Sequence, residues 1–259
     1  WRLFGTYSAN ENTVMELTDD LFALQLQNTL SGRGSMEARV GQSMSAIYGT
    51  GYKRAPDGQI VYGEDGYPLL ADDLIYLGDS NPKGKGSFGT EIKYKGISLN
   101  ILFDGQFGGK GYSFTNAMLM EHGKHEKTLS GRYNGIIGDG VIENPDGTYR
   151  KNDVVAEEIW TYYTRHGGRE NLEGSMFNTD FLKLRELTLS YSFPARICKK
   201  IGMRKLSVGI YGRDLFMITN WPAFDPEFGT LNNGTIDKGF EIAQFPATRN
   251  FGVKLNIEF

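Results

Sequence analysis

The sequence predicts an all-β protein: a portion of an antiparallel transmembrane β-barrel with long extracellular loops that contain short helices. Several segments alternate apolar and polar residues with a period of two, as strands with two unlike faces do. Short turns alternate with long loops along the chain, which is typical of outer-membrane barrels. The composition agrees, because the 259 residues include 34 glycines, 16 phenylalanines and 14 tyrosines but only 8 prolines.

Segment 248–259 carries the clearest strand pattern. In it, Phe251, Val253, Leu255, Ile257 and Phe259 alternate with Gly252, Lys254, Asn256 and Glu258. A strand whose last residue is Phe fits the aromatic girdle at the periplasmic boundary of an outer-membrane barrel. The alternative for this stretch is the edge strand of a soluble β-sandwich, in which the five apolar residues would contact a core.

Overall properties exclude several classes of protein. The formal net charge of -3 and the pI of about 5.7 leave no basic surface, so no nucleic-acid partner is expected. No apolar run reaches the roughly 18 residues of a transmembrane helix, and a mean hydropathy of -0.39 is compatible with alternating barrel strands. Cys198 is the single cysteine, so no internal disulfide can form. Since the chain begins at Trp1 without a leader, we expect it to be the later part of an exported precursor.

The first third of the chain mixes strand and turn signals. Segment 1–9 is a weak strand, 21–27 fits either a strand or a short helix, and 31–35 is a turn. The pattern of 40–52 predicts a strand that ends at glycines. Segment 53–85 holds several Asp-Gly and Pro turn signals, so we expect a loop there.

A hairpin follows, and after it a long insertion. Within 88–104, apolar residues alternate with polar ones on both sides of the tight turn Lys95-Gly96. About seventy residues without the alternating strand pattern come next. Residues 116–127 and 154–165 have helical spacing, and 144–147 is a turn. Insertions of this length are rare in compact soluble domains but ordinary in the outward loops of barrels.

Two more strands and a further long loop precede the last strand. The strands are 187–193 and 206–211, joined by 194–203, and the loop is 217–247. If Phe259 marks the periplasmic end, the long loops 53–85, 108–179 and 217–247 are all extracellular, and the turns 95–96 and 194–203 are periplasmic. Roughly seven strands with all long loops on one side are therefore expected, as in outer-membrane barrels.

Several short motifs, spread over nearly the whole chain, occur in the same order as in a known protein family. They are VGQ (40–42), IYG (47–49), LGDSNP (77–82), YKG (94–96), FLKLRELTLSYSFP (181–194), YGRDLF (211–216), FDPE (224–227) and FPATRNFG (245–252). In these segments the chain resembles the SusC/RagA family of TonB-dependent outer-membrane transporters of Bacteroidetes-type bacteria.

The resemblance implies that residues 1–259 form the C-terminal part of a barrel of about 22 strands, with the plug domain and earlier strands outside this chain. It implies active import of a nutrient, either a glycan or an oligopeptide, across the bacterial outer membrane. A SusD-like surface lipoprotein would be the partner, and the TonB-ExbB-ExbD complex would act through the N-terminal part that is absent here. About seven strands would leave two unpaired edges in lipid, so the earlier strands should be needed for stability.

Two alternatives stay open on the residues alone. A surface or secreted β-sandwich could bind glycan without transport. An outer-membrane enzyme would need a clustered acid and base, and the sequence offers none, so no enzymatic activity is expected.

Motifs for metals, cofactors and nucleophiles are incomplete. His122 and His125 form H-x-x-H without the Glu of H-E-x-x-H and without a third ligand. The glycines of 108–113 lack the order of a phosphate-binding loop, and the Asp-Gly pairs lack the ladder of a calcium loop. Cys198 has no histidine nearby in the sequence. No metal site, cofactor or catalytic residue is therefore predicted.

Aromatic residues in the long loops are the candidate contacts to the substrate or to the lipoprotein. They are Tyr112, Phe114, Trp160, Trp221, Phe224 and Phe228. The alternative is that these loops pack on one another and rim the barrel. On the strands, the polar positions are expected to face the lumen, because the opposite parity is apolar and suits lipid. These lumen-facing candidates are Tyr211, Lys254, Asn256 and Glu258, together with Thr188, Ser190 and Ser207.

Overall fold

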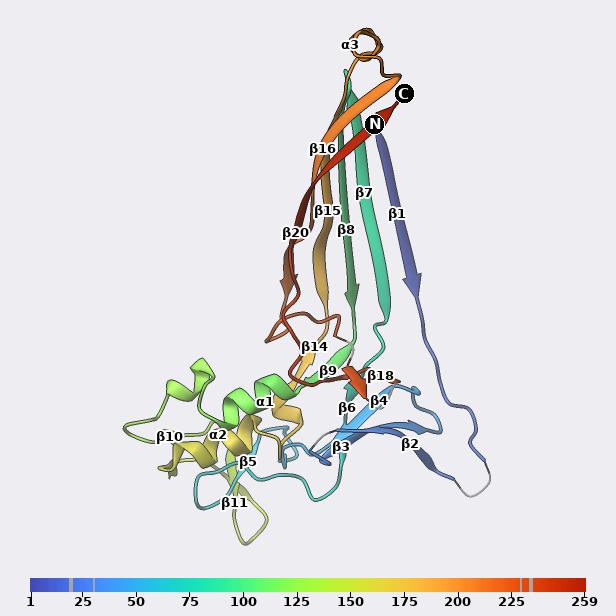
Figure 1. Cartoon of the computed structure of the whole chain (residues 1–259). Coiled ribbons are helices and arrows are strands. Elements are labelled where there is room, and N and C mark those ends of the chain that lie inside the picture. The colour runs from blue at the N-terminus through green and yellow to red at the C-terminus, as the bar shows by residue number, and fades with distance from the viewer. Residues whose placement is uncertain (19–20, 30, 229, 233–234) are drawn as a thin grey trace.

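Six long antiparallel strands form a single sheet, which we call the wall. The computed structural model describes residues 1–18, 21–29, 31–228, 230–232 and 235–259. The strands of the wall, in spatial order, are β1 (Arg2–Ala9), β7 (Gly84–Tyr94), β8 (Ile97–Phe107), β15 (Phe181–Ser192), β16 (Lys205–Thr219) and β20 (Asn250–Glu258). Figure 1 shows them side by side, with the other strands and α1 and α2 gathered in a cap at one end. Within the described residues β1 and β20 are the edges of this sheet.

The two ends of the wall differ as the sequence predicts. At one end lie the chain termini, the tight turn at Lys95 and Gly96, and α3 (Ala195–Lys200) between β15 and β16 (Figure 1). Lys95 and Gly96 both have positive φ, 46° and 87°, which a two-residue hairpin turn of type I′ requires. At the other end three long connections, 10–83, 108–180 and 220–249, enter the cap. The predicted segregation of long and short connections is confirmed.

The prediction of a single strand over residues 40–52 is wrong. This stretch contains a turn at Gly41 and only the short β4 (Ala46–Gly49), which pairs with β3 (Gly34–Arg39) and β6 (Ile75–Asp79) in the cap. A barrel strand needs about 9–11 residues to cross a bilayer, and four residues cannot do so. The wall therefore has six strands rather than seven, and the whole of 10–83 is one connection.

The register of the wall separates two faces. Leu99, Leu189, Ile210 and Val253 are neighbours across four strands and share the apolar face. Asn100, Thr188, Tyr211 and Gly252 are neighbours one position along and share the polar face. Nothing in the described part of the chain covers this apolar face, since Leu189, Ile210 and Val253 are 45%, 60% and 74% exposed. None of the helices in the described ranges is long and apolar enough to span a membrane.

The three connections build the cap from short elements. The first holds β2 (Ala23–Asn28), β3, β4, β5 (Val61–Tyr62) and β6. The second holds β9 (Lys110–Ser113), α1 (Phe114–Glu121), η1 (Glu126–Leu129), β10 (Ile136–Ile137), β11 (Val141–Glu143), β12 (Tyr149–Lys151), β13 (Val155–Ala156), α2 (Ile159–Gly167), η2 (Glu173–Ser175) and β14 (Met176–Asn178). The third holds β17 (Thr230–Asn232), β18 (Thr235–Asp237) and β19 (Phe240–Glu241). Segment 21–27 is thus largely a strand, and the helix expected over 154–165 begins only at Ile159.

The connections share their cores, so the cap folds as one unit. One cluster joins Ile47 of the first connection, Tyr112 and Leu172 of the second and Phe240 of the third. A second cluster joins Tyr62 of the first connection to α2 and its neighbours in the second. Parallel pairings of β5 with β11 and of β19 with β9 reinforce the same contacts. The long loops therefore pack on one another. This packing is what the sequence analysis gave as the alternative to direct contact between the loop aromatics and a ligand.

Glu241 ties the third connection to the start of α1. Its side chain is fully buried and accepts hydrogen bonds from Ser113 Oγ at 2.8 Å and from Thr115 Oγ1 at 2.6 Å. The backbone N–H groups of Thr115 and Gln244 donate to it as well, at 3.1 and 3.2 Å. A carboxylate at a helix N-terminus is favoured by the helix dipole, and four donors offset the cost of burying it.

Candidate functional site

The residues expected to face the lumen all lie on the polar face of the wall. Asn256 Nδ2 donates a hydrogen bond to Ser207 Oγ at 3.1 Å, and Glu258 pairs with Lys205 at 2.8 Å. Tyr211 is the cross-strand partner of Gly252, where a Cβ atom would lie 2.6 Å from the Tyr211 ring. Glycine at 252 therefore lets the tyrosine ring lie flat over the neighbouring strand.

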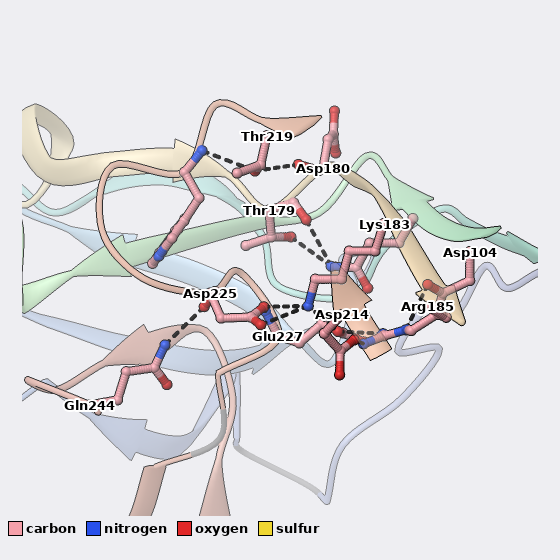
Figure 2. A network of polar contacts seen from close by, with 12 residues as sticks. Asp104, Thr179, Asp180, Lys183, Arg185, Asp214, Thr219, Asp225, Glu227 and Gln244 are labelled. Carbon is pink, nitrogen blue, oxygen red and sulfur yellow. Dashed lines mark hydrogen bonds and ion pairs between the residues drawn. The ribbon is translucent and has the colours of Figure 1, made fainter. Parts of the chain in front are cut away.

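Where the wall meets the cap, this polar face carries a cluster of charges, which we call the ion cluster. Its members are Asp104, Lys183, Arg185, Asp214, Asp225 and Glu227 (Figure 2). Lys183 Nζ lies 2.6 and 2.7 Å from the two carboxylate oxygens of Asp225 and also bonds Glu227. Strands β8, β15 and β16 and the third connection are thereby joined at one point.

Arg185 is the second cation of the ion cluster. Its Nε lies 2.7 Å from Asp104 Oδ1 and its Nη1 lies 3.0 Å from Asp214 Oδ1. Its Nη2 bonds Glu227, which is therefore shared with Lys183. A planar guanidinium can hold three carboxylates in this way because its donors point outward in a fixed fork.

An irregularity in the sheet puts these cations on the polar face. In a regular strand Lys183, Arg185, Leu187 and Leu189 would share one face, which would mix charge with the lipid-like side. The register shifts between Leu184 and Glu186 in both pairings of β15, as in a β-bulge. Residues 184 and 187 can then both lie on the apolar face. The sequence carries a signal for this shift, because the apolar parity changes from 182 and 184 to 187 and 189.

Burial makes the ion cluster depend on all its members. Only 4% of the Lys183 side chain is exposed, and a buried cation without a partner is strongly destabilising. The third connection is also held by hydrogen bonds around Asp225, whose Oδ1 accepts the N–H of Glu227 and whose carbonyl accepts Gln244 Nε2 (Figure 2). The ion cluster therefore clamps the third connection against the wall.

Sequence reasoning missed the ion cluster as a site, although it quoted the segments that form it. Motifs 181–194, 211–216 and 224–227 each contribute a charged residue. Their separation in the chain hid their contact in space. The ion cluster contains no nucleophile, and the described residues hold no group of three or more His, Cys, Asp or Glu side chains that could bind a metal ion.

The six aromatic candidates separate by exposure. Tyr112 and Trp221 are buried, and Trp221 stacks on Phe228 with ring centroids 4.9 Å apart. Phe114 starts α1 and packs against the first core cluster. Trp160 on α2 and Phe224 in the third connection are exposed, and Phe224 adopts a positive φ of 60°. Only these last two present a large aromatic surface to solvent.

The two histidines of H-x-x-H take structural positions. His125 caps η1, because its Nδ1 accepts the N–H of Lys127 at 3.1 Å. His122 follows the last turn of α1. Cys198 is the buried residue of α3, with its Sγ 3.6 Å from the carbonyl oxygen of Phe193.

A third histidine, which the sequence did not single out, lies where the first and second connections meet. The Nδ1 and Nε2 atoms of His166 lie 3.1 Å from the hydroxyl oxygens of Tyr52 and Tyr62. The Tyr52 hydroxyl also donates to the His166 carbonyl at 2.6 Å. Burial lowers the pKa of His166 to about 4 and raises the pKa of both tyrosines. The imidazole is therefore neutral at pH 7 and serves as a hydrogen-bonded joint within the cap.

Sequence comparison finds relatives among receptors. The TonB-dependent receptor P3 of Formosa agariphila is 25% identical across 100% of this chain, and the match covers 27% of that receptor. The TonB-dependent receptor P26 of the same organism is 22% identical, with the same coverage of both. The chain thus spans about a quarter of the length of these curated relatives. No protein-family model matches it.

Comparison of structures gives the same architecture. A structure of the RagAB peptide transporter superposes with a TM-score of 0.66 at 16% identity, over 99% of this chain and 27% of that chain. The RagAB peptide importer in its open-open state superposes with a TM-score of 0.63. At this identity the likeness concerns the fold, and the fold class predicted from the sequence is confirmed.

We expect Lys183→Met to release the third connection from the wall. The variant leaves Asp225 without its cation and Glu227 with Arg185 alone, at a cost on the order of 3 kcal/mol. Hydrogen exchange of amides 221–228 should rise about a hundredfold, as that loss implies. Lys254→Met is the matched control, because Lys254 lies on the same face and has no ion pair within the described residues. Equal exchange in both variants would contradict the clamp.

Acidification should loosen the cap through His166. The folded-state pKa of about 4 lies below the ordinary 6.5, so the unfolded cap binds the proton more readily. Stability is therefore lost as the pH falls from about 6.5 to about 4, by about 3 kcal/mol in total. Hydrogen exchange in α2, corrected for intrinsic rates, measures this. His166→Gln should reduce the dependence, and the lowered pKa values of Glu121 and Glu158 account for what remains, whereas His122→Gln, at an exposed position, should keep it in full.

Proposed function

Because the chain is a SusC/RagA-like TonB-dependent transporter chain, we propose that it supplies wall, polar path and outer rim to an outer-membrane β-barrel that actively imports a nutrient. The single observation that carries this proposal is the uncovered apolar face of the wall. The relatives are receptors and transporters, not enzymes, and the chain is not an enzyme.

Lipid is the environment that suits the apolar face. Leu189, Ile210 and Val253 form a continuous row across the strands, and all are exposed. A contiguous apolar surface of this kind is unfavourable in water, and in a soluble sandwich a second sheet would cover it. Among the described residues no second sheet does so. This argues against the alternative of a secreted glycan-binding sandwich.

The polar face is then assigned to the lumen. Tyr211, Lys254, Asn256 and Glu258 would line the substrate path or contact a plug domain. Two of these side chains are tied to the neighbouring strand β16, because Asn256 bonds Ser207 and Glu258 pairs with Lys205. Under this assignment the ion cluster lies at the outer mouth of the lumen, between wall and cap.

The wall needs further strands to close. β1 and β20 each pair on one side only within the described residues, and an unpaired edge in lipid leaves backbone groups unsatisfied. We therefore assign residues 1–259 to the C-terminal part of a larger barrel. The plug domain and the segment that contacts TonB would belong to the remaining three quarters of such a protein.

The cap is assigned to the extracellular side, where it would meet a SusD-like surface lipoprotein and the substrate. The fold resembles a transporter described as importing peptides, and the alternative substrate class is a glycan. Of the aromatic candidates, Trp160 and Phe224 are accessible for such contacts as the cap stands. The other four candidates would affect binding only indirectly, because they pack inside the cap and support its shape. They are Tyr112, Phe114, Trp221 and Phe228.

A lysine placed on the apolar face should impair membrane insertion, whereas a lysine on the polar face should be tolerated. Leu255→Lys places a charge on the apolar face, at a cost of about 2 to 4 kcal/mol near mid-bilayer. Asn256→Lys, one residue along, places the same charge on the polar face and should be tolerated. The complete protein is expressed with each change and its amount in the detergent-extracted outer membrane is measured. Normal insertion of Leu255→Lys would contradict the assignment of the apolar face to lipid.

Import is tested in cells that depend on the protein for a nutrient. Growth is measured on a panel of single glycans and peptides with the parent strain, a strain that lacks this protein and a strain that lacks TonB. We expect both deletions to abolish growth on the same member of the panel. Growth equal to that of the parent on every member would contradict active import.

A further inference from the structure

A polar pocket lies in the cap between α2 and the turn that precedes β3. Its volume is about 460 Å³, within the range of small-ligand sites. One wall is α2 with Trp160 and Arg165, and the other is Arg33 of the first connection. The pocket is thus assembled from two connections that the shared cores hold in place.

Trp160 offers the pocket an aromatic face. The opposite side of α2 is buried through Tyr162 and Tyr163, so the orientation of the helix is determined by packing. Trp160 nevertheless stays 59% exposed and, among the described residues, is the one aromatic residue that lines the pocket. Indole combines a large apolar surface with an N–H donor, a combination common where amphipathic ligands bind.

The arginines of the pocket differ in how firmly they are paired. Arg169 is held by Glu121 through two hydrogen bonds, at 2.6 and 2.8 Å, so its guanidinium serves the fold. Arg33 lies 3.9 Å from Glu170, which also lines the pocket, and Arg165 lies 3.8 Å from Asp65 with its guanidinium 5.3 Å from the Tyr67 ring centroid. Pairs of this length between exposed groups contribute little. Arg33 and Arg165 therefore keep donors for an anionic ligand group, which a guanidinium can bind through two hydrogen bonds.

The remaining lining suits hydroxyl groups. Ser31 and Thr161 contribute side-chain hydroxyls, and every lining residue in the described part of the chain other than Trp160 is polar. The hydroxyl and charged groups of this lining match the hydroxyl and acidic groups of a sugar.

We propose that this pocket binds an acidic glycan, a sugar chain that carries carboxylate or sulfate groups. One sugar ring packs its C–H face on Trp160, its acidic group bonds Arg33 and Arg165, and its hydroxyls bond Ser31 and Thr161. This inference rests on the proposed function, since it names the substrate class that the extracellular cap receives.

The test is equilibrium binding to the complete protein in detergent, measured by calorimetry. The probes are a galacturonic acid hexamer, a sulfated galactose hexamer, the neutral maltohexaose and hexaglutamate. We expect at least one acidic sugar to bind and maltohexaose to bind at least about tenfold more weakly, as the loss of a charge-assisted hydrogen bond predicts. Trp160→Ala and Arg165→Gln should each weaken that binding by a similar factor. Arg150→Gln, an arginine of the same connection that pairs with Asp153 outside the pocket, should not.

Four results would overturn the inference: no binding of either acidic sugar, equal binding of maltohexaose, tighter binding of hexaglutamate, or binding unaffected by both pocket variants. Limited proteolysis of each variant confirms that the cap is folded, and Arg33→Gln provides a second pocket variant if one fails to fold. The growth assay separates the two proposals. Acidic-sugar binding without TonB-dependent growth contradicts import alone, and TonB-dependent growth without acidic-sugar binding contradicts the pocket assignment alone.

Discussion

The constraint on which the structure depends is that one face of a six-stranded wall must remain apolar while the other remains polar. Because side chains alternate along each strand, a shift of one residue in any register would carry charge to the apolar face. The observed pairings keep Leu189, Ile210 and Val253 in one row and Thr188 and Tyr211 in the next. An uncovered apolar row is stable against hydrocarbon and unstable in water, so the environment of the wall follows from its register.

At the ion cluster, the alternation of polar and apolar residues along β15 is interrupted. The bulge near Arg185 changes the parity of β15, so that the cations reach the polar face while leucines on both sides of the bulge stay on the apolar face. The carboxylates that pair with the cations come partly from the third connection, through Asp225 and Glu227. A local irregularity in one strand thus also decides where the cap is attached. This coupling holds the third connection at the junction of wall and cap.

The cap behaves as one folded body rather than as three independent loops. Its core clusters draw side chains from each connection, and Glu241 joins the third connection to α1 through four hydrogen bonds. Long connections usually carry function on a rigid support, and here they provide much of that support themselves. Exposed groups such as Trp160 are therefore presented from fixed positions, which favours specific recognition over non-specific contact.

The sequence by itself determined the strand alternation, the segregation of long and short connections, and the polar and apolar parities of the wall, because these are local periodic properties of the chain. It misjudged 40–52 and the start of α2, since short apolar runs fit several structures and tertiary packing chose among them. Only the tertiary structure brought Lys183 to Asp225 and Trp160 to Arg33, and it buried Trp221. Contacts between residues far apart in the chain depend on how the connections fold together, which no local pattern records.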